Sequence, residues 1–106
     1  MIVQGTDLTM TRGDSEDITV TCQDDPFAEG DTVTMTVRKN YESGIAFQKV
    51  ITEFENGAAV ILIEPGDTEG LDFGAYIYDV QVDRASGIRK TPVKPSRFTI
   101  DKEVTF

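Results

Sequence analysis

The sequence predicts an all-β domain, an antiparallel β-sandwich of seven to nine strands. Apolar and polar residues alternate with a period of two along most of the chain, and no segment of helical length has a period near 3.6. The alternating runs are rich in valine, isoleucine and threonine, which suit a pleated, half-buried surface. Turn signals separate these runs at short intervals, and a length of 106 residues indicates a single domain, residues 1–106. A closed barrel is the alternative architecture, because alternation alone does not distinguish the two.

Each expected strand is a run whose apolar side chains share one face. The first strand is expected near residues 7–11, and the second places Ile18, Val20 and Cys22 toward the core. The remaining runs are residues 31–38 with Val33, Met35 and Val37 inward, then 46–55, 58–64, 75–82, 88–91, and a closing run from residue 97 to the end of the chain.

Turn residues stand between these runs. Arg12, Gly13 and Asp14 spell a tripeptide that animal integrins recognise, but their position predicts a hairpin turn between the first two strands. Asn56 and Gly57 predict a two-residue type I′ turn that joins residues 46–55 to residues 58–64. Residues 24–31 and 84–87 are the other expected connections.

The segment 65–74 is expected to contain one short helical turn, with Asp67 or Thr68 as its cap.

The spacing of Leu71, Asp72, Gly74 and Tyr76 is similar to the tyrosine corner of immunoglobulin-like domains. The resemblance implies that the Tyr76 hydroxyl bonds to the backbone of the preceding loop. It also implies that Leu71 closes the base of the core and that Gly74 lets the chain pass tightly. Tyr78 stands where antibody domains carry a disulfide cysteine, and a single cysteine excludes an internal disulfide. The expected fold is therefore an immunoglobulin-like sandwich without that bridge.

The order of motifs over nearly the whole chain resembles small immunoglobulin-like modules of bacteriophage and prophage structural proteins, found in baseplates, tail fibres and head or neck appendages. The matching motifs are the RGD turn, the PGDT turn at residues 65–68, the GAYIYD strand at residues 74–79, and the basic segment before Phe98. Ser15 departs from the threonine expected after the RGD turn. The resemblance implies a non-enzymatic assembly module that binds other virion proteins or copies of itself as a homo-oligomer. It would reside in the virion, or in the host bacterial cytoplasm during assembly.

Composition argues against several other functions. The chain has no histidine, the commonest general base and zinc ligand, so we expect no catalytic, cofactor-binding or metal-binding residues. A net charge of −9 argues against nucleic-acid binding. No apolar run approaches the length of a membrane span, and the first residues lack the pattern of a signal peptide. The acidic group Asp24, Asp25, Glu29 and Asp31 offers oxygen ligands, but its spacing does not match a calcium loop, and a solvated turn is expected.

Ala58, Val60 and Leu62 form the candidate interaction surface. If Ala59, Ile61 and Ile63 face the core, these three residues form an apolar outward row. Such a row is either covered within the sandwich or offered to a partner. Four aromatic residues are candidates to extend the surface: Tyr41, Phe47, Phe54 and Phe73.

Two further alternatives concern function and orientation. A carbohydrate- or surface-ligand-binding sandwich is the second functional hypothesis, although the absence of tryptophan disfavours it. Residues 1–31 hold eight acidic residues and one arginine, a balance of −7, whereas residues 84–102 hold six basic residues and one aspartate, a balance of +5. These two segments either pair within the fold or orient neighbouring copies head to tail.

Overall fold

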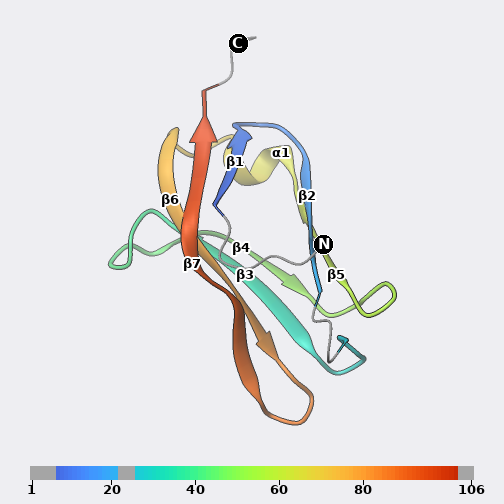
Figure 1. The fold of residues 1–106 in the computed structure, drawn as a ribbon. Helices are drawn as coiled ribbons and strands as arrows, with labels where there is room; N and C mark the ends of the chain where they lie inside the picture. Colours follow the sequence, from blue (N-terminus) through green and yellow to red (C-terminus); the bar gives the residue numbers. More distant parts are fainter. Residues whose placement is uncertain (1–6, 22–25, 103–106) are drawn as a thin grey trace.

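The computed structural model describes residues 7–21 and 26–102. These residues form seven strands and one short helix (Figure 1). In chain order the elements are β1 (Leu8–Thr11), β2 (Glu16–Val20), β3 (Thr32–Arg38), β4 (Ile45–Ile51), β5 (Ala59–Ile63), α1 (Pro65–Thr68), β6 (Gly74–Asp83) and β7 (Arg89–Asp101). The predicted all-β class is confirmed. Cys22, Asp24 and Asp25 lie outside the described residues, as does the end of the closing run.

The strands form two sheets, a five-stranded sheet in the order β1-β7-β6-β3-β4 and a two-stranded sheet of β2 and β5. Pairing is antiparallel except between β1 and β7, which run parallel with Leu8 opposite Phe98. The sequence predicted an antiparallel sandwich, and this one pair of strands departs from that prediction. The exception is at the edge of the larger sheet, where β1 lies beside the last strand.

The core lies between the two sheets and is built by the predicted alternation. Val33, Met35 and Val37 of β3 are fully buried. From the opposite sheet, Ile18, Val20, Ala59, Ile61 and Ile63 are buried, so the predicted inward faces are confirmed for β5 and, as far as Val20, for β2. The core is completed by Met10, Phe27, Tyr76, Tyr78, Val80, Val82, Phe98 and Ile100.

The hairpin predicted between the first two strands is wrong because its turn changes sheets, and the predicted turn at Asn56 and Gly57 is present but also leads from one sheet to the other. The turn at Gly13 (φ 83°) leads from β1 in the larger sheet to β2 in the smaller one. Asn56 and Gly57 do adopt the positive φ angles of a type I′ turn, 52° and 78°. The flanking residues Glu55 and Ala58 form only an isolated bridge, after which β4 pairs with β3 and β5 pairs with β2.

The predicted helical turn is present as α1, but its N-cap is Glu64. Asp67 assists from the third helical position, where its Oδ2 accepts a hydrogen bond from the Glu64 amide at 2.8 Å. Thr68 is not a cap. Its side chain is buried, and its Oγ1 accepts a bond from the amide of Gly13 at 2.9 Å.

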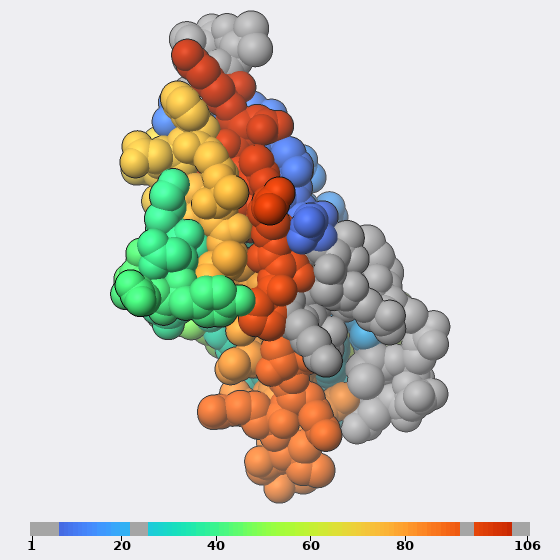
Figure 2. All heavy atoms as spheres, turned by 60° about the vertical axis from the view of Figure 1, so that its left-hand side comes forward, coloured from blue at the N-terminus to red at the C-terminus, as the bar shows by residue number. Residues whose placement is uncertain are grey.

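The hairpin of β6 and β7 is the longest feature of the sandwich, which measures 44 × 29 × 20 Å. Its loop closes through the amide of Gly87, which donates to the Arg84 carbonyl at 2.9 Å, and the amide of Arg84, which donates to the Ile88 carbonyl at 2.8 Å. The two expected runs at 88–91 and from 97 are a single strand, β7, whose register with β6 shifts near Val80. The loop stands at the end of the molecule opposite α1 (Figure 1) and forms a projecting end of the molecule (Figure 2).

Candidate interaction surfaces

The four residues of the predicted tyrosine corner lie together at the start of β6. The Tyr76 hydroxyl donates a hydrogen bond to the backbone carbonyl of Asp72 at 2.8 Å, the contact that defines such a corner. Leu71 packs against the core cluster. Burial is the main cause that raises the pKa of Tyr76, and the charge of Asp72 adds to it. The motif therefore fixes the loop before β6 and is structural.

Gly74 has a different role from the one expected. A side chain at this position would meet only the Lys39 Nζ, at the ordinary contact distance of 3.7 Å, so the chain does not pass tightly here. The φ angle of Gly74 is 133°, a region that residues with side chains rarely adopt. Backbone conformation explains the glycine.

The RGD tripeptide is held as a turn that joins the two sheets. The amide of Asp14 donates to the Thr11 carbonyl at 3.1 Å, and Gly13 is tied to Thr68. The Arg12 guanidinium donates to the Leu71 carbonyl at 3.2 Å and lies 4.9 Å from the Phe73 ring centroid. Because the arginine already stabilises the fold, the tripeptide fits its predicted role as a turn.

Within the predicted acidic group, Asp31 is buried and fully engaged. Its carboxylate accepts bonds from the amides of Ala28 and Ala85 at 3.0 and 2.9 Å, and pairs with the Arg84 guanidinium at 2.9 Å. Hydrogen bonds from the two amides, together with Arg84, hold the pKa of Asp31 below its usual range despite its burial. No cluster of three or more potential metal ligands occurs among residues 7–21 and 26–102.

The outward row of the predicted interaction surface lies on the two-stranded sheet. Ala58 and Val60 are half-buried, and Leu62 is 57% exposed. Across the sheet, Thr19 stands opposite Val60 and Asp17 stands opposite Leu62. Ala58 precedes the first residue of β5, so the strand itself presents Val60 and Leu62 outward.

Leu62 borders a hollow of about 300 Å³, which we call the acidic hollow. It is lined by Ser15, Glu16, Asp17, Leu62, Ile63 and Glu64. Three of these side chains carry carboxylates, because the start of β2 lies beside the end of β5. An exposed leucine is thus surrounded by negative charge. Sequence reasoning found Leu62 but missed its acidic surroundings, because these depend on the β2–β5 register.

The aromatic residues expected to extend this surface do not do so. Phe47 packs edge-on against Phe98 in the core, with ring centroids 5.8 Å apart. Phe54 packs against Phe27 at 5.4 Å. Phe73 lies near the cations of Arg12 and Lys102, which are 4.9 and 5.7 Å from its ring centroid. None of these three is among the residues lining the acidic hollow.

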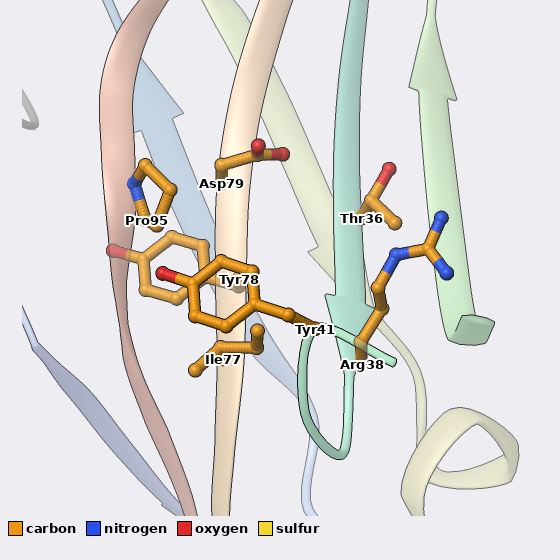
Figure 3. A pocket seen from close by; sticks show the side chains of 7 residues that line it. All are labelled: Thr36, Arg38, Tyr41, Ile77, Tyr78, Asp79 and Pro95. Atoms are coloured by element: carbon orange, nitrogen blue, oxygen red, sulfur yellow. The ribbon is translucent and has the colours of Figure 1, made fainter. Parts of the chain in front are cut away.

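Tyr41 marks a second hollow, on the outer side of the five-stranded sheet (Figure 3). Its side chain is 75% exposed and extends from the β3–β4 loop across β6 toward Pro95 of β7 (Figure 3). The hollow has a volume of about 100 Å³, and its other lining residues are Thr36, Arg38, Ile77, Tyr78 and Asp79.

Polar groups in this second hollow are held in place from several strands. The Arg38 guanidinium donates to the Ser43 carbonyl at 2.8 Å, and Gln48 Nε2 donates to Thr36 Oγ1 at 2.9 Å. Burial raises the pKa of the Asp79 carboxyl, and the charge of Arg38 opposes that shift. The hollow combines an exposed aromatic ring with fixed hydrogen-bonding groups. Sequence reasoning missed it, although the outward positions of Ile77 and Asp79 were visible in the alternation.

The two oppositely charged segments of the sequence meet in the fold. β1 pairs with β7 along its length, and Arg84 pairs with Asp31. Arg97 also donates its amide to the Asp7 carboxylate at 2.9 Å. The structure therefore shows internal charge pairing for Arg84 and Asp31, while Lys90 remains exposed on the hairpin, where it can orient a neighbouring copy. Arg89 pairs with Asp83 across the exposed hairpin.

A comparison with protein-family models gave no match for the chain, and a search of curated proteins gave no relative. Within the described ranges, no helix has the length and apolar character that crossing a membrane requires.

Proposed function

We propose that this chain is a non-enzymatic structural module that works through protein–protein contacts, with other virion proteins of a phage or prophage, or copies of itself, as its partners. The order of its motifs supports the phage context, and the exposed row of β5 supports the mode of action. A chain without histidine that carries a tyrosine corner and a turn-forming RGD motif uses its recognisable motifs to stabilise a fold.

The observation that carries this proposal is Leu62, more than half exposed beside the acidic hollow on a two-stranded sheet. Complete burial of a leucine side chain stabilises a protein by roughly 1.5–3 kcal/mol, so about half of that free energy is still available to a partner. β2 and β5 also pair with each other alone among the described strands, and strand edges of this kind favour association.

Light scattering over a range of protein and salt concentrations tests the proposal. We expect association that Val60→Lys and Leu62→Lys both weaken. Val50→Lys is the matched control, because Val50 is 56% exposed but lies on β4 of the other sheet. If both β5 variants associate as the wild type does, the surface is wrong. A protein that stays monomeric requires a different protein as its partner, and its complex with that protein must then be sensitive to Leu62→Lys.

A second candidate function is the binding of a carbohydrate in the Tyr41 hollow. It is favoured by the exposed ring beside Arg38 and Asp79, because sugars stack on aromatic faces while their hydroxyls bond to polar groups. The chain has three tyrosines and no tryptophan, so tyrosine fluorescence reports on this site. Titration with soluble bacterial surface oligosaccharides should change that fluorescence in the wild type and not in Tyr41→Ala. An identical response from both proteins would exclude this site.

A further inference from the structure

We propose that the acidic hollow of one copy receives the β6–β7 hairpin tip of a second copy, so that copies associate head to tail. The hairpin tip comprises residues 84–90. This inference rests on the proposed function, since it names the partner of the β5 surface. It depends on three properties of the two surfaces: apolar exposure, charge and position.

The best partner for the acidic hollow is an apolar side chain flanked by cations. Leu62 supplies exposed apolar surface, and Glu16, Asp17 and Glu64 surround it with three negative charges. Within the described part of the chain, no ion pair involves any of these three carboxylates. A neutral apolar partner would desolvate these charges without compensation, whereas a basic partner would pair with them.

The hairpin tip has the complementary composition. Ile88 is 54% exposed, and the next two residues are Arg89 and Lys90, both exposed. Arg89 is bonded to Asp83 at 2.6 Å, but both side chains are well exposed, and such surface pairs contribute little to stability. The guanidinium of Arg89 can therefore turn to a stronger partner. Arg84, in contrast, is committed to Asp31 and positions the tip from within the fold.

The tip is also closed by hydrogen bonds and accessible. Its loop is closed by the two backbone hydrogen bonds between Arg84 and residues 87 and 88, and Gly87 takes the positive φ of 94° that the turn needs. The tip projects beyond the rest of the sandwich (Figure 2). A preorganised loop loses little conformational entropy when it binds.

The positions of the two surfaces make the contact head to tail. The acidic hollow is formed next to α1, where β2 begins and β5 ends, and the hairpin tip lies at the opposite end of the molecule (Figure 1). One copy therefore cannot place its own tip in its own hollow. Two different surfaces that meet between identical copies give a heterologous contact, which repeats into a ring or an open chain.

A charge-reversal experiment tests this pairing. Asp17→Lys reverses a charge of the hollow, and Lys90→Glu reverses a charge of the tip. Each variant alone places like charges at positions 17 and 90 of neighbouring copies and reduces the opposite charge of one surface, so we expect self-association to weaken by at least about tenfold. In an equimolar mixture, the wild-type tip of the first variant meets the wild-type hollow of the second, and the two reversed surfaces also match. Sedimentation velocity should therefore show association restored in the mixture. Glu42→Lys, an equal charge reversal at an exposed position of the β3–β4 loop, should behave as the wild type.

The outcomes separate this inference from the proposed function. If Leu62→Lys abolishes association while Lys90→Glu does not weaken it, the β5 surface is correct and the hairpin tip is not its occupant. If each reversal weakens association but the mixture does not recover, the two charges do not face each other, and the inference is wrong. A wild-type protein that remains monomeric also overturns it, and leaves the proposed function to a heterologous partner. Urea unfolding of each variant verifies that it is folded, which is expected because both substitutions are at exposed positions.

Discussion

Replacing Tyr76 with phenylalanine removes one oxygen atom and leaves the buried ring in place. The hydroxyl donates to the Asp72 carbonyl at 2.8 Å, and the tyrosine as a whole is buried. An intramolecular hydrogen bond contributes about 0.5–1.5 kcal/mol net, and an unsatisfied buried acceptor costs about 1–3 kcal/mol. Asp72 is itself exposed, so water can partly replace the lost donor. We therefore expect a loss of about 1–2 kcal/mol in the free energy of unfolding.

Urea unfolding measures this loss directly, and thermal unfolding gives an independent value. For a domain of this size, 1 kcal/mol corresponds to a decrease in Tm of about 4–8 °C. The matched control is Tyr41→Phe, which removes the same oxygen from a ring that is 75% exposed. It should change stability by less than about 0.5 kcal/mol. If the two variants have the same stability, the Tyr76 hydroxyl does not hold the loop before β6, and the corner has no energetic role.

Four further predictions concern single positions or conditions. Gly57→Ala should destabilise the domain more than Gly87→Ala. Both glycines have a positive φ, which costs about 1–2 kcal/mol when the residue has a side chain, but of the two only a Cβ at position 57 would meet Pro26 Cβ, at 2.6 Å. Equal losses of stability in urea unfolding would contradict this clash. Asp31→Asn should lower stability at neutral pH and make the remaining stability less sensitive to acid. A carboxyl whose pKa is lowered by folding stabilises the fold at pH values above its ordinary pKa of 3.8, and this stabilisation is lost as the pH falls below 3.8. An acid transition that is the same in both proteins would count against this prediction. Burial, with a contribution from the charge of Asp7, raises the pKa of Tyr78 to about 12, so the neutral hydroxyl contributes its full stability below pH 10 and loses it as the pH rises toward 12. The free energy of unfolding should therefore fall less steeply with alkaline pH in Tyr78→Phe than in the wild type. Equal slopes would refute the assignment. Millimolar calcium should leave Tm unchanged, and a clear increase would show a metal site linked to folding.

The sequence was sufficient to predict which side chains face the core, because that information is local. A period of two fixes the parity of a strand, and Val33, Met35 and Val37 are fully buried as the alternation predicts. The turn at Asn56 and Gly57 was predictable for the same reason, since its positive φ angles depend on these two residues.

Strand pairing could not be predicted, because it depends on contacts between distant residues. The Asn56–Gly57 turn closes a single bridge and does not decide which sheet receives the strands on either side. The acidic residues around Leu62 could not be predicted from the sequence for a related reason. Asp17 stands opposite Leu62 only because β2 and β5 pair in one register, and a shift of one residue would put a different side chain there.

The Tyr41 hollow required still more information. Its lining comes from β3, the β3–β4 loop, β6 and β7, and each contribution depends on a separate pairing. The register shift near Val80 also changes which residues of β7 lie beside β6. A list of alternating residues holds none of these relationships.

Hydrogen exchange measured at low and high protein concentration tests the central claim most directly, because it locates the contact without a substitution. If the β2–β5 face is the docking surface, exchange in Glu16–Val20 and Ala59–Ile63 should slow as concentration rises, or on addition of the heterologous partner. The head-to-tail contact further predicts slower exchange at residues 84–90. Slower exchange confined to other strands, with β2 and β5 unchanged in a sample that light scattering shows to be associated, would contradict the account.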